Sequence, residues 1–264
     1  MPETPYIVLG GTGLIGSAVC AYLESQGKSV VSVNTRNYKD NIGKRAKVLI
    51  NCNGNSFRYR ANQNPCWDFE VSVTSVERSL FDFKTDLYIY ISTVDVYNMK
   101  DDPAQNHENS TIDTDKLDSY GFHKWLAERL VQKFAARSVI LRLGTVIGEK
   151  LKKGPIYDIL NEQELHMSLD SELSFIDTKN IARTINVIID KGIKDEIINV
   201  TGTGSVRLRD LQHKLPFPIR VAPGSETVKH SYNINNIKLC DILPIHTSME
   251  ITEEFLGNYI RAEL

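Results

Sequence analysis

A glycine-rich turn near the start of the chain limits the fold more than any other feature. Residues 10–16 read Gly-Gly-Thr-Gly-Leu-Ile-Gly and follow an apolar run that begins at Tyr6. Apolar residues then recur at helical spacing over 14–23, and Gln26-Gly27 is a typical helix end. An apolar strand, a glycine turn and a helix predict the first βα unit of a parallel sheet with both faces covered.

The same turn predicts a ligand. Gly11, Gly13 and Gly16 fit the spacing G-x-G-x-x-G. In this motif glycine lets the backbone approach a pyrophosphate, and the helix N-terminus offers free N–H groups. The alternative is a structural turn without a ligand, but the strand before it and the helix after it favour binding. We expect a nicotinamide dinucleotide to lie against Gly10, Gly11, Thr12, Gly13, Leu14, Ile15 and Gly16.

The end of the second expected strand, Val30–Thr35, favours one form of that cofactor. An acidic residue here would hold the adenosine ribose hydroxyls of NAD, but the chain has Asn34 and then Arg36. An amide does not repel a 2′-phosphate, and a guanidinium can bind one. We expect Asn34 and Arg36 to contact the cofactor and to favour NADP over NAD. The alternative for Arg36 is an ordinary solvated arginine.

Strand and helix patterns alternate along the rest of the chain, and the turn signals become denser after Gly148. They predict a Rossmann-like doubly wound parallel sheet. Residues 1–148 are interpreted as a dinucleotide-binding domain. Residues 149–264 are interpreted as a smaller C-terminal substrate lobe, partly interleaved with the sheet. The expected strands are 48–53, 86–93, 138–143 and 196–200, and the expected helices are 69–82, 119–136, 155–162, 178–191 and 249–262.

Composition excludes several classes of protein. The chain has 264 residues, 41% hydrophobic and 24% charged, with a net charge of −2, which is typical of a globular protein with a sizeable core. The balanced charge argues against nucleic acid and membranes as partners, and no apolar run approaches the roughly 18 residues of a membrane span. The cysteines and histidines show no metal-ligand spacing, so we expect no metal and a cytoplasmic protein with reduced thiols.

A tyrosine and a lysine form the second chemical signal. Tyr120 and Lys124 lie four residues apart in a helical segment and therefore on one face. A phenol has a pKa near 10, and a nearby ammonium favours its ionised form, which suits it to acid–base catalysis. On its own this spacing is more often a surface cation beside a core tyrosine. Together with the glycine turn, it favours catalysis.

At this point the sequence resembles the extended short-chain dehydrogenase/reductases, the NAD(P)-dependent epimerase/dehydratase group, over most of its length. Besides the glycine turn and the Tyr120–Lys124 pair, four segments resemble those of the family: Cys52–Gly54, Ile91–Tyr97, Leu141–Gly148 and Phe175–Ala182. The resemblance implies that Thr93 hydrogen-bonds the substrate oxygen, Tyr120 exchanges the proton and Lys124 holds the nicotinamide ribose. It also implies that Asn53 and Gly54 lie beside the cofactor. Asp95 corresponds to an acidic position of dehydratase-type members, with a solvated loop aspartate as the alternative.

Three departures from the family pattern weaken the prediction of a substrate. Thr145 stands where nucleotide-sugar enzymes usually have Asn, and Leu173 stands where an arginine often pairs with the diphosphate. Too few residues separate Arg36 from Val48 for the usual extra strand and helix, so the sheet should be trimmed on the adenosine side to five or six strands. Arg58, with Arg60, is a candidate for the missing diphosphate contact, and a solvated loop cation is an equal alternative.

Other residues are interpreted as structural. His123 should point away from Tyr120, because adjacent helical residues do not share a face. Trp67 and Trp125 are expected to be core or interface anchors. By analogy with the family, Phe81, Phe83 and Trp125 would suit a homodimer interface.

These features together favour an NAD(P)-dependent oxidoreductase or epimerase acting by hydride transfer on a sugar carbonyl or alcohol. The leading variant is a nucleotide-sugar 4-ketoreductase or 4-epimerase. One alternative is an NADPH-dependent reductase of a non-sugar ketone or aldehyde, which the missing diphosphate residues favour. The other is a non-catalytic cofactor-sensing protein, against which the presence of Thr93, Tyr120 and Lys124 together argues.

Overall fold

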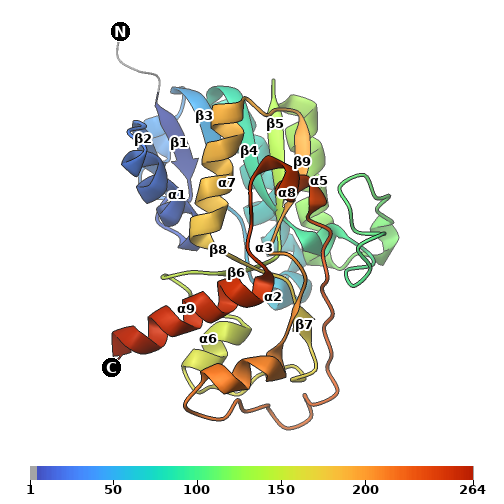
Figure 1. The fold of residues 1–264 in the computed structure, drawn as a ribbon. Helices are drawn as coiled ribbons and strands as arrows, with labels where there is room; N and C mark the ends of the chain where they lie inside the picture. Colours follow the sequence, from blue (N-terminus) through green and yellow to red (C-terminus); the bar gives the residue numbers. More distant parts are fainter. Residues whose placement is uncertain (1–4, 264) are drawn as a thin grey trace.

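The computed structural model describes residues 5–263 and is built around a parallel sheet of six strands (Figure 1). The strand order is β2-β1-β3-β4-β5-β9, so β1 lies between β2 and β3 and the chain winds outward in both directions. This is the doubly wound sheet that the sequence predicts. The strands are β1 (Tyr6–Leu9), β2 (Val30–Val33), β3 (Arg45–Asn51), β4 (Lys84–Thr93), β5 (Ser138–Leu143) and β9 (Glu196–Val200).

Helices cover both faces of the sheet, which explains why every residue of β1 and β5 is buried. α1 (Leu14–Ser25) and α7 (Thr178–Lys191) pack together on one face, and α4 (Ser75–Asp82) and α5 (Ser119–Phe134) pack together on the other (Figure 1). Successive β1 side chains enter different cores: Val8 belongs to the core on the α1 face, whereas Ile7 belongs to the core on the α5 face.

The trimmed edge is present as predicted. Between β2 and β3 the chain forms only a 3-10 turn (Lys39–Asn41), and β1 pairs directly with both strands. Residues 69–82 are helical as predicted, but the helical segment begins at Pro65 and is not uniform. Pro65 starts α3 (Pro65–Phe69), a π-helical turn (Glu70–Thr74) follows, and α4 continues from there. A short helix, α2 (Arg58–Gln63), replaces the loop that was expected after β3.

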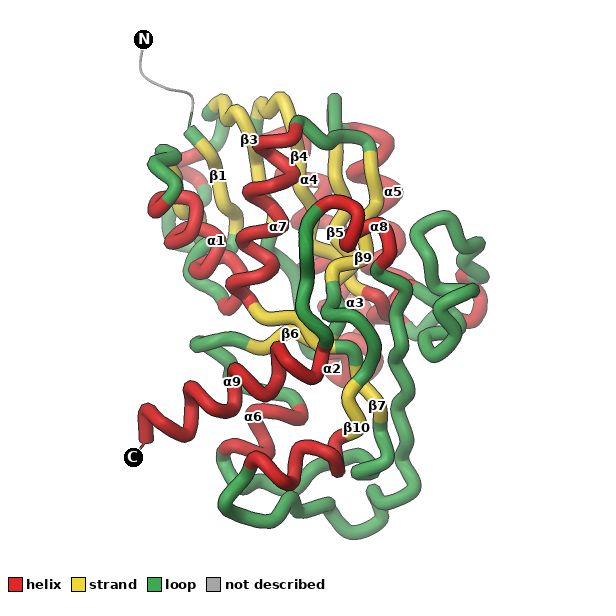
Figure 2. Tube along the Cα trace, viewed as in Figure 1, coloured by secondary structure: helices red, strands yellow, loops and turns green. Residues whose placement is uncertain are grey.

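A smaller lobe lies beyond the carboxyl ends of the strands and is rich in loops (Figure 2). Two short two-stranded sheets stand there: β6 (Thr145–Ile147) runs parallel to β8 (Phe175–Asp177), and β7 (Glu172–Leu173) runs antiparallel to β10 (Val206–Arg207). The helices of this lobe are α6 (Pro155–Leu160) and α9 (Ser248–Glu263), whereas α8 (Ile237–Ile242) packs beside β9 at the edge of the main sheet (Figure 1). Residues 215–236 form a long loop that leads to α8 (Figure 2).

The residues that α5 (Ser119–Phe134) buries most deeply are not those of its apolar stripe. The apolar residues Phe122, Leu126 and Leu130 are only partly buried. The fully packed face carries instead Tyr120, His123, Lys124, Ala127, Glu128 and Val131. A helix that buries its charged side chains needs partners for them, and these partners form the site described below.

The deepest of these partnerships joins α5 to β5. Arg142 is 1% exposed, and its guanidinium donates to both carboxylate oxygens of Glu128, at 3.0 and 2.7 Å. Arg142 also donates to the Tyr97 hydroxyl, which donates in turn to the Asn199 side chain at 2.8 Å. The Asn199 amide donates to the carbonyls of Asn106 and Asn235, so this one side chain holds the loop after β4 and the long loop before α8.

No helix among the described residues is both long enough and apolar enough to cross a bilayer.

Candidate active site

The glycine turn has the geometry of an anion site. β1 ends at Leu9, and Gly10 adopts a positive φ of 73°; a Cβ there would lie 2.8 Å from Asn53 Oδ1. Gly13 precedes α1 without a side-chain cap, and the first turn of α1 carries no acidic residue. The N–H groups at this helix end and their positive dipole are therefore available to a pyrophosphate. The residues present fit a dinucleotide.

The loop after β3 lies between this turn and the predicted catalytic helix. Asn53 is held at its start, because its N–H donates to Asn51 Oδ1 at 2.9 Å. Gly54 follows, and a Cβ at this position would lie 3.8 Å from Lys124 Nζ. The predicted cofactor residues Asn53 and Gly54 thus connect the two halves of the site.

The adenosine end contains no carboxylate at the position where NAD enzymes usually have one. Asn34 follows β2, and its Oδ1 accepts the Arg36 N–H at 2.9 Å. Arg36 itself is exposed. Since Gly10 N donates to Val33 O at 2.8 Å, this corner lies next to the glycine turn.

Tyr120 is brought to Thr93 by a close backbone contact. Thr93 ends β4, and its hydroxyl accepts the Asp95 N–H at 3.1 Å. Gly121 packs against this turn so closely that a Cβ would lie 2.6 Å from the Asp95 carbonyl. Burial, together with the charges of Asp95 and Asp68, raises the pKa of Tyr120, and the Thr93 hydroxyl acts in the opposite direction.

Lys124 is fully packed one turn later. Its Nζ donates to the Ile91 carbonyl at 2.7 Å and lies 4.7 Å from the centre of the Tyr90 ring. Burial lowers the pKa of Lys124 to about 8, although Glu128 and Asp68 oppose this. The sequence predicts an ammonium that lowers the pKa of Tyr120, but burial and the neighbouring carboxylates raise this pKa instead.

Asp95 is not a solvated loop aspartate. Its side chain is 16% exposed, and it lies 3.6 Å from both Arg58 and Lys100. It accepts a hydrogen bond from Tyr232 at 2.7 Å and one from the Thr93 hydroxyl at 3.3 Å. The structure thus brings Asp95 into the group formed by Thr93 and Tyr120.

Arg58 is likewise not a solvated loop cation. It lies at the start of α2 and is bound to Asp118 and to the Tyr232 hydroxyl. The Arg58 guanidinium is therefore already paired within the protein. Thr145 lies on β6 beside Phe175, two residues beyond Leu143, which pairs with Thr93 in the main sheet. Arg60 stacks on the Trp67 ring with 3.9 Å between the guanidinium carbon and the ring centre.

Sequence reasoning missed three residues of this network: Asp118, Tyr232 and Asp68. Asp118 caps α5 by accepting the Gly121 N–H at 2.9 Å, and an acidic residue just before a helical segment was the available signal. Tyr232 is 137 positions from its partner Asp95, and no sequence signal relates them. Asp68 is fully buried beside His123, whose ring nitrogen lies 2.7 Å from its carboxylate.

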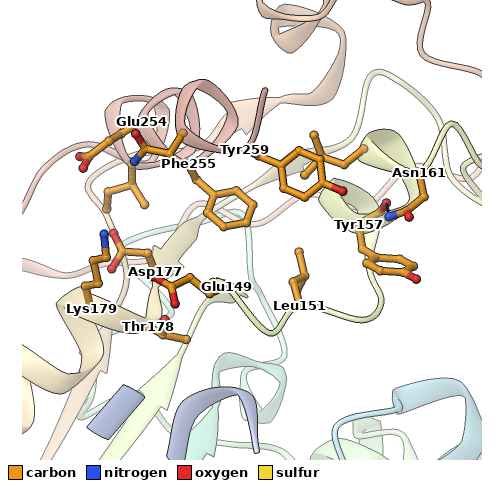
Figure 3. Close-up of a pocket in the computed structure, with 14 residues that line it drawn as sticks. Glu149, Leu151, Tyr157, Asn161, Asp177, Thr178, Lys179, Glu254, Phe255 and Tyr259 are labelled. Atoms are coloured by element: carbon orange, nitrogen blue, oxygen red, sulfur yellow. Dashed lines mark hydrogen bonds between the residues drawn. The ribbon is translucent and has the colours of Figure 1, made fainter. Parts of the chain in front are cut away.

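A cavity of about 400 Å³ lies between α6, the start of α7 and α9 (Figure 3). The Tyr157, Phe255 and Tyr259 rings line it, with Glu149 and Leu151 below them. None of the described residues lining it belongs to the predicted site. Among the described residues, no group of three histidine, cysteine or acidic side chains is placed to hold a metal.

The sequence matches the NAD dependent epimerase/dehydratase family over residues 6–64 and 71–201. The chain belongs to this family. A search of curated proteins found no match. The family's members are NAD-dependent enzymes, so this chain, with its fold and its glycine turn, is an enzyme.

Solved structures show the family's fold over the whole chain. MoeE5 in complex with UDP-glucuronic acid and NAD is 16% identical, with 98% of this chain and 100% of that chain covered and a TM-score of 0.80. A UDP-galactose 4-epimerase is 19% identical, with 99% and 100% covered and a TM-score of 0.78. The UDP-glucuronic acid 4-epimerase from Bacillus cereus, in complex with UDP-glucuronic acid and NAD, is 17% identical, with 99% and 100% covered and a TM-score of 0.75.

Proposed function

We propose that the protein transfers hydride to or from C4 of a nucleotide-activated sugar, as a 4-ketoreductase or a 4-epimerase. The observation that carries this proposal is the gathering of Thr93, Tyr120 and Lys124 beside Gly54 and the uncapped start of α1. The similar structures named above include proteins with UDP-sugars bound, which supports the substrate class.

Each of the three residues has one task in this proposal. A bound nicotinamide dinucleotide supplies the hydride chemistry. The Thr93 hydroxyl orients the substrate oxygen, and Tyr120 exchanges its phenolic proton with that oxygen. The raised pKa of Tyr120 keeps the phenol protonated at neutral pH, which suits it to donate a proton to a carbonyl. Lys124 Nζ, at the level of Gly54, holds the ribose hydroxyls of the cofactor.

We also propose NADP as the favoured cofactor, with NAD as the alternative. The absence of a carboxylate at Asn34 and the exposed guanidinium of Arg36 support NADP. Both of the structures named above that contain a dinucleotide hold NAD. Fluorescence titration with NADPH and NADH decides between them, and tighter binding of NADH would remove the argument from Arg36.

The proposal on oligomeric state concerns the outer surface of α4 and α5. Phe81 and Phe134 are 66% and 45% exposed, and their ring centres lie 5.3 Å apart. We propose that this surface forms a homodimer. Phe83 does not take part, because it is buried against Tyr38. Light scattering of the wild type and of Phe81→Ser tests this proposal.

A reductase of a non-sugar ketone or aldehyde is the second candidate. Leu173, at the position where the family often has an arginine, is 4% exposed and belongs to the core. Arg58, one of the two cations near Asp95, is already bound to Asp118. Both observations leave the diphosphate of a nucleotide sugar without an obvious partner.

Turnover assays separate these candidates. The protein is incubated with NAD or NADP and with UDP-glucose, UDP-galactose or UDP-glucuronic acid, and the products are followed by absorbance at the reduced nicotinamide band and by NMR. Thermal shift with UDP, GDP, dTDP and CDP tests nucleotide recognition in parallel. Stabilisation by none of the four would favour the non-sugar substrate, and cofactor binding without turnover of any carbonyl would favour a sensor.

A further inference from the structure

Asp68 is an unusual group to find beneath the candidate site. Its side chain is fully buried on α3, a helix that no site prediction used. Its carboxylate accepts hydrogen bonds from Asn55 Nδ2 and Ser72 Oγ, each at 3.0 Å. The third partner is His123 Nδ1 at 2.7 Å. Because a carboxylate only accepts, the proton lies on this ring nitrogen.

The partners of Asp68 belong to two different sides of the site. Asn55 lies one residue beyond Gly54, in the loop that also carries Asn53 against the glycine turn. Its Oδ1 accepts the Phe57 N–H at 2.7 Å, so the loop is tied into one conformation. His123 is on α5, immediately before Lys124.

We propose that Asp68 and His123 are positioning residues: the buried carboxylate joins the loop 52–57 to α5 through Asn55 and His123, and this link sets where Lys124 and Tyr120 stand relative to the cofactor. Burying a carboxylate is costly unless its partners are fixed, and an amide, a hydroxyl and an imidazole meet that requirement here. This inference rests on the proposed function, because it assigns the link to the cofactor site.

The charge of Asp68 also acts on both groups. The charged and titratable groups that face Lys124 are Glu128 on α5, Asp68 on α3 and Cys52 at the end of β3, with the Tyr90 ring of β4 beside it. Those that face Tyr120 are Asp95, Asp68 and Asp118. Burial lowers the pKa of Lys124 to about 8, and Asp68 is one of the two carboxylates that keep it from falling further.

The decisive variant is Asp68→Asn, which keeps the shape and removes the charge. Titration of the Lys124 side chain by ¹³C NMR, in the cofactor-free full chain, needs no ligand. We expect its midpoint to fall by roughly 1 pH unit in the variant. Asp82→Asn is the matched control: Asp82 also accepts a side-chain hydrogen bond, from the Tyr38 hydroxyl at 2.9 Å, but it lies on α4 outside the site, so the midpoint should not move.

NADH binding measures the consequence at the site. With half of the wild-type Lys124 protonated at pH 8 and about a tenth in Asp68→Asn, we expect about fivefold weaker binding of NADH at this pH. A wild type that binds neither NADH nor NADPH would refute the proposed function, whereas the NMR titration would still decide the role of Asp68. An unchanged Lys124 midpoint in Asp68→Asn would overturn the proposal.

Variants of His123 test the link separately and remain informative if Asp68→Asn does not fold. His123→Ala removes the connection to α5 and leaves the Asp68 charge, and we expect NADH binding to weaken about tenfold. His123→Asn places an N–H donor at the position of Nδ1 and should restore most of the affinity. Equal NADH affinity in the Ala and Asn variants would show that His123 only fills space.

Discussion

The ammonium of Lys124 donates to the carbonyl of Ile91 at 2.7 Å, with its side chain 4% exposed. This buried charge is thus satisfied by the backbone of β4 rather than by a carboxylate in direct contact. A ligand hydroxyl at Gly54 would add a second acceptor, so cofactor binding and the protonation of Lys124 are coupled.

Lys124→Met should stabilise the protein. The pKa of Lys124 falls from its ordinary value to about 8, so at pH 7 the folded chain carries a buried charge at a cost that the variant avoids. We expect the free energy of unfolding to rise by about 2 kcal/mol, with NADH binding lost. Urea denaturation at pH 7 measures the gain, and Lys133→Met, at an exposed position of the same helix, should change stability little.

The pH dependence of this difference follows from the sign of the shift. Above pH 8 the folded wild type releases the Lys124 proton, which the unfolded chain retains until about pH 10.4. The stability of the wild type therefore rises with pH over this interval, and the gap to Lys124→Met narrows. A gap that stays constant from pH 7 to 10 would contradict a buried, titrating Lys124.

Tyr120→Phe should remove proton transfer and leave the cofactor site in place. We expect turnover to fall at least ~10²-fold, with an NADH affinity close to that of the wild type. Steady-state rates and fluorescence titration measure the two effects. Tyr59→Phe, at a position 62% exposed on α2, serves as the control, and full activity of Tyr120→Phe would assign acid–base catalysis to another residue.

Arg142→Met should be strongly destabilising, because the buried Glu128 carboxylate loses its bidentate partner and retains the partly exposed Arg129, at 3.5 Å, as its ion-pair partner. We expect a loss of about 3–5 kcal/mol in the free energy of unfolding. The double variant Glu128→Met/Arg142→Met removes both charges and should recover at least half of that loss. Chemical denaturation of the single and double variants provides the comparison, and additive losses would show that the two residues act independently.

Arg36→Ala should change cofactor selectivity. Loss of the guanidinium should weaken NADPH binding about tenfold and NADH binding less than twofold. The control for loss of a surface arginine is Arg45→Ala, because the Arg45 side chain is exposed and paired with Asp86. Equal effects of Arg36→Ala on both dinucleotides would mean that Arg36 does not contact the 2′-phosphate.

Local sequence patterns predicted the sheet and much of the helix content, because both depend on local signals. α7 was predicted at its observed bounds: Asp177 caps its first turn by accepting the Asn180 N–H, and Gly192 ends it in a left-handed conformation. Residues 69–82 are helical as predicted, but the helical segment begins earlier than its apolar pattern suggests, because Asn64 and Pro65 start α3.

The site was predictable only as far as its residues carry motifs. Thr93, Tyr120, Lys124 and Gly54 were identified from spacing and family resemblance, and the structure brings them together. Asp95 and Arg58 were given solvated alternatives because their partners, Tyr232 and Asp118, are distant in sequence or on another element. The burial of His123 and Glu128 was also missed, because the apolar stripe Phe122, Leu126 and Leu130 is the more obvious candidate for the buried face of α5.

Asn199 has a wider consequence. Its side-chain amide is shared by Tyr97, by the loop containing Asn106 and by the long loop containing Asn235. These two loops, more than a hundred positions apart in the sequence, are therefore expected to move together. A substrate that has to displace one of these loops must therefore also overcome the contacts that hold the other.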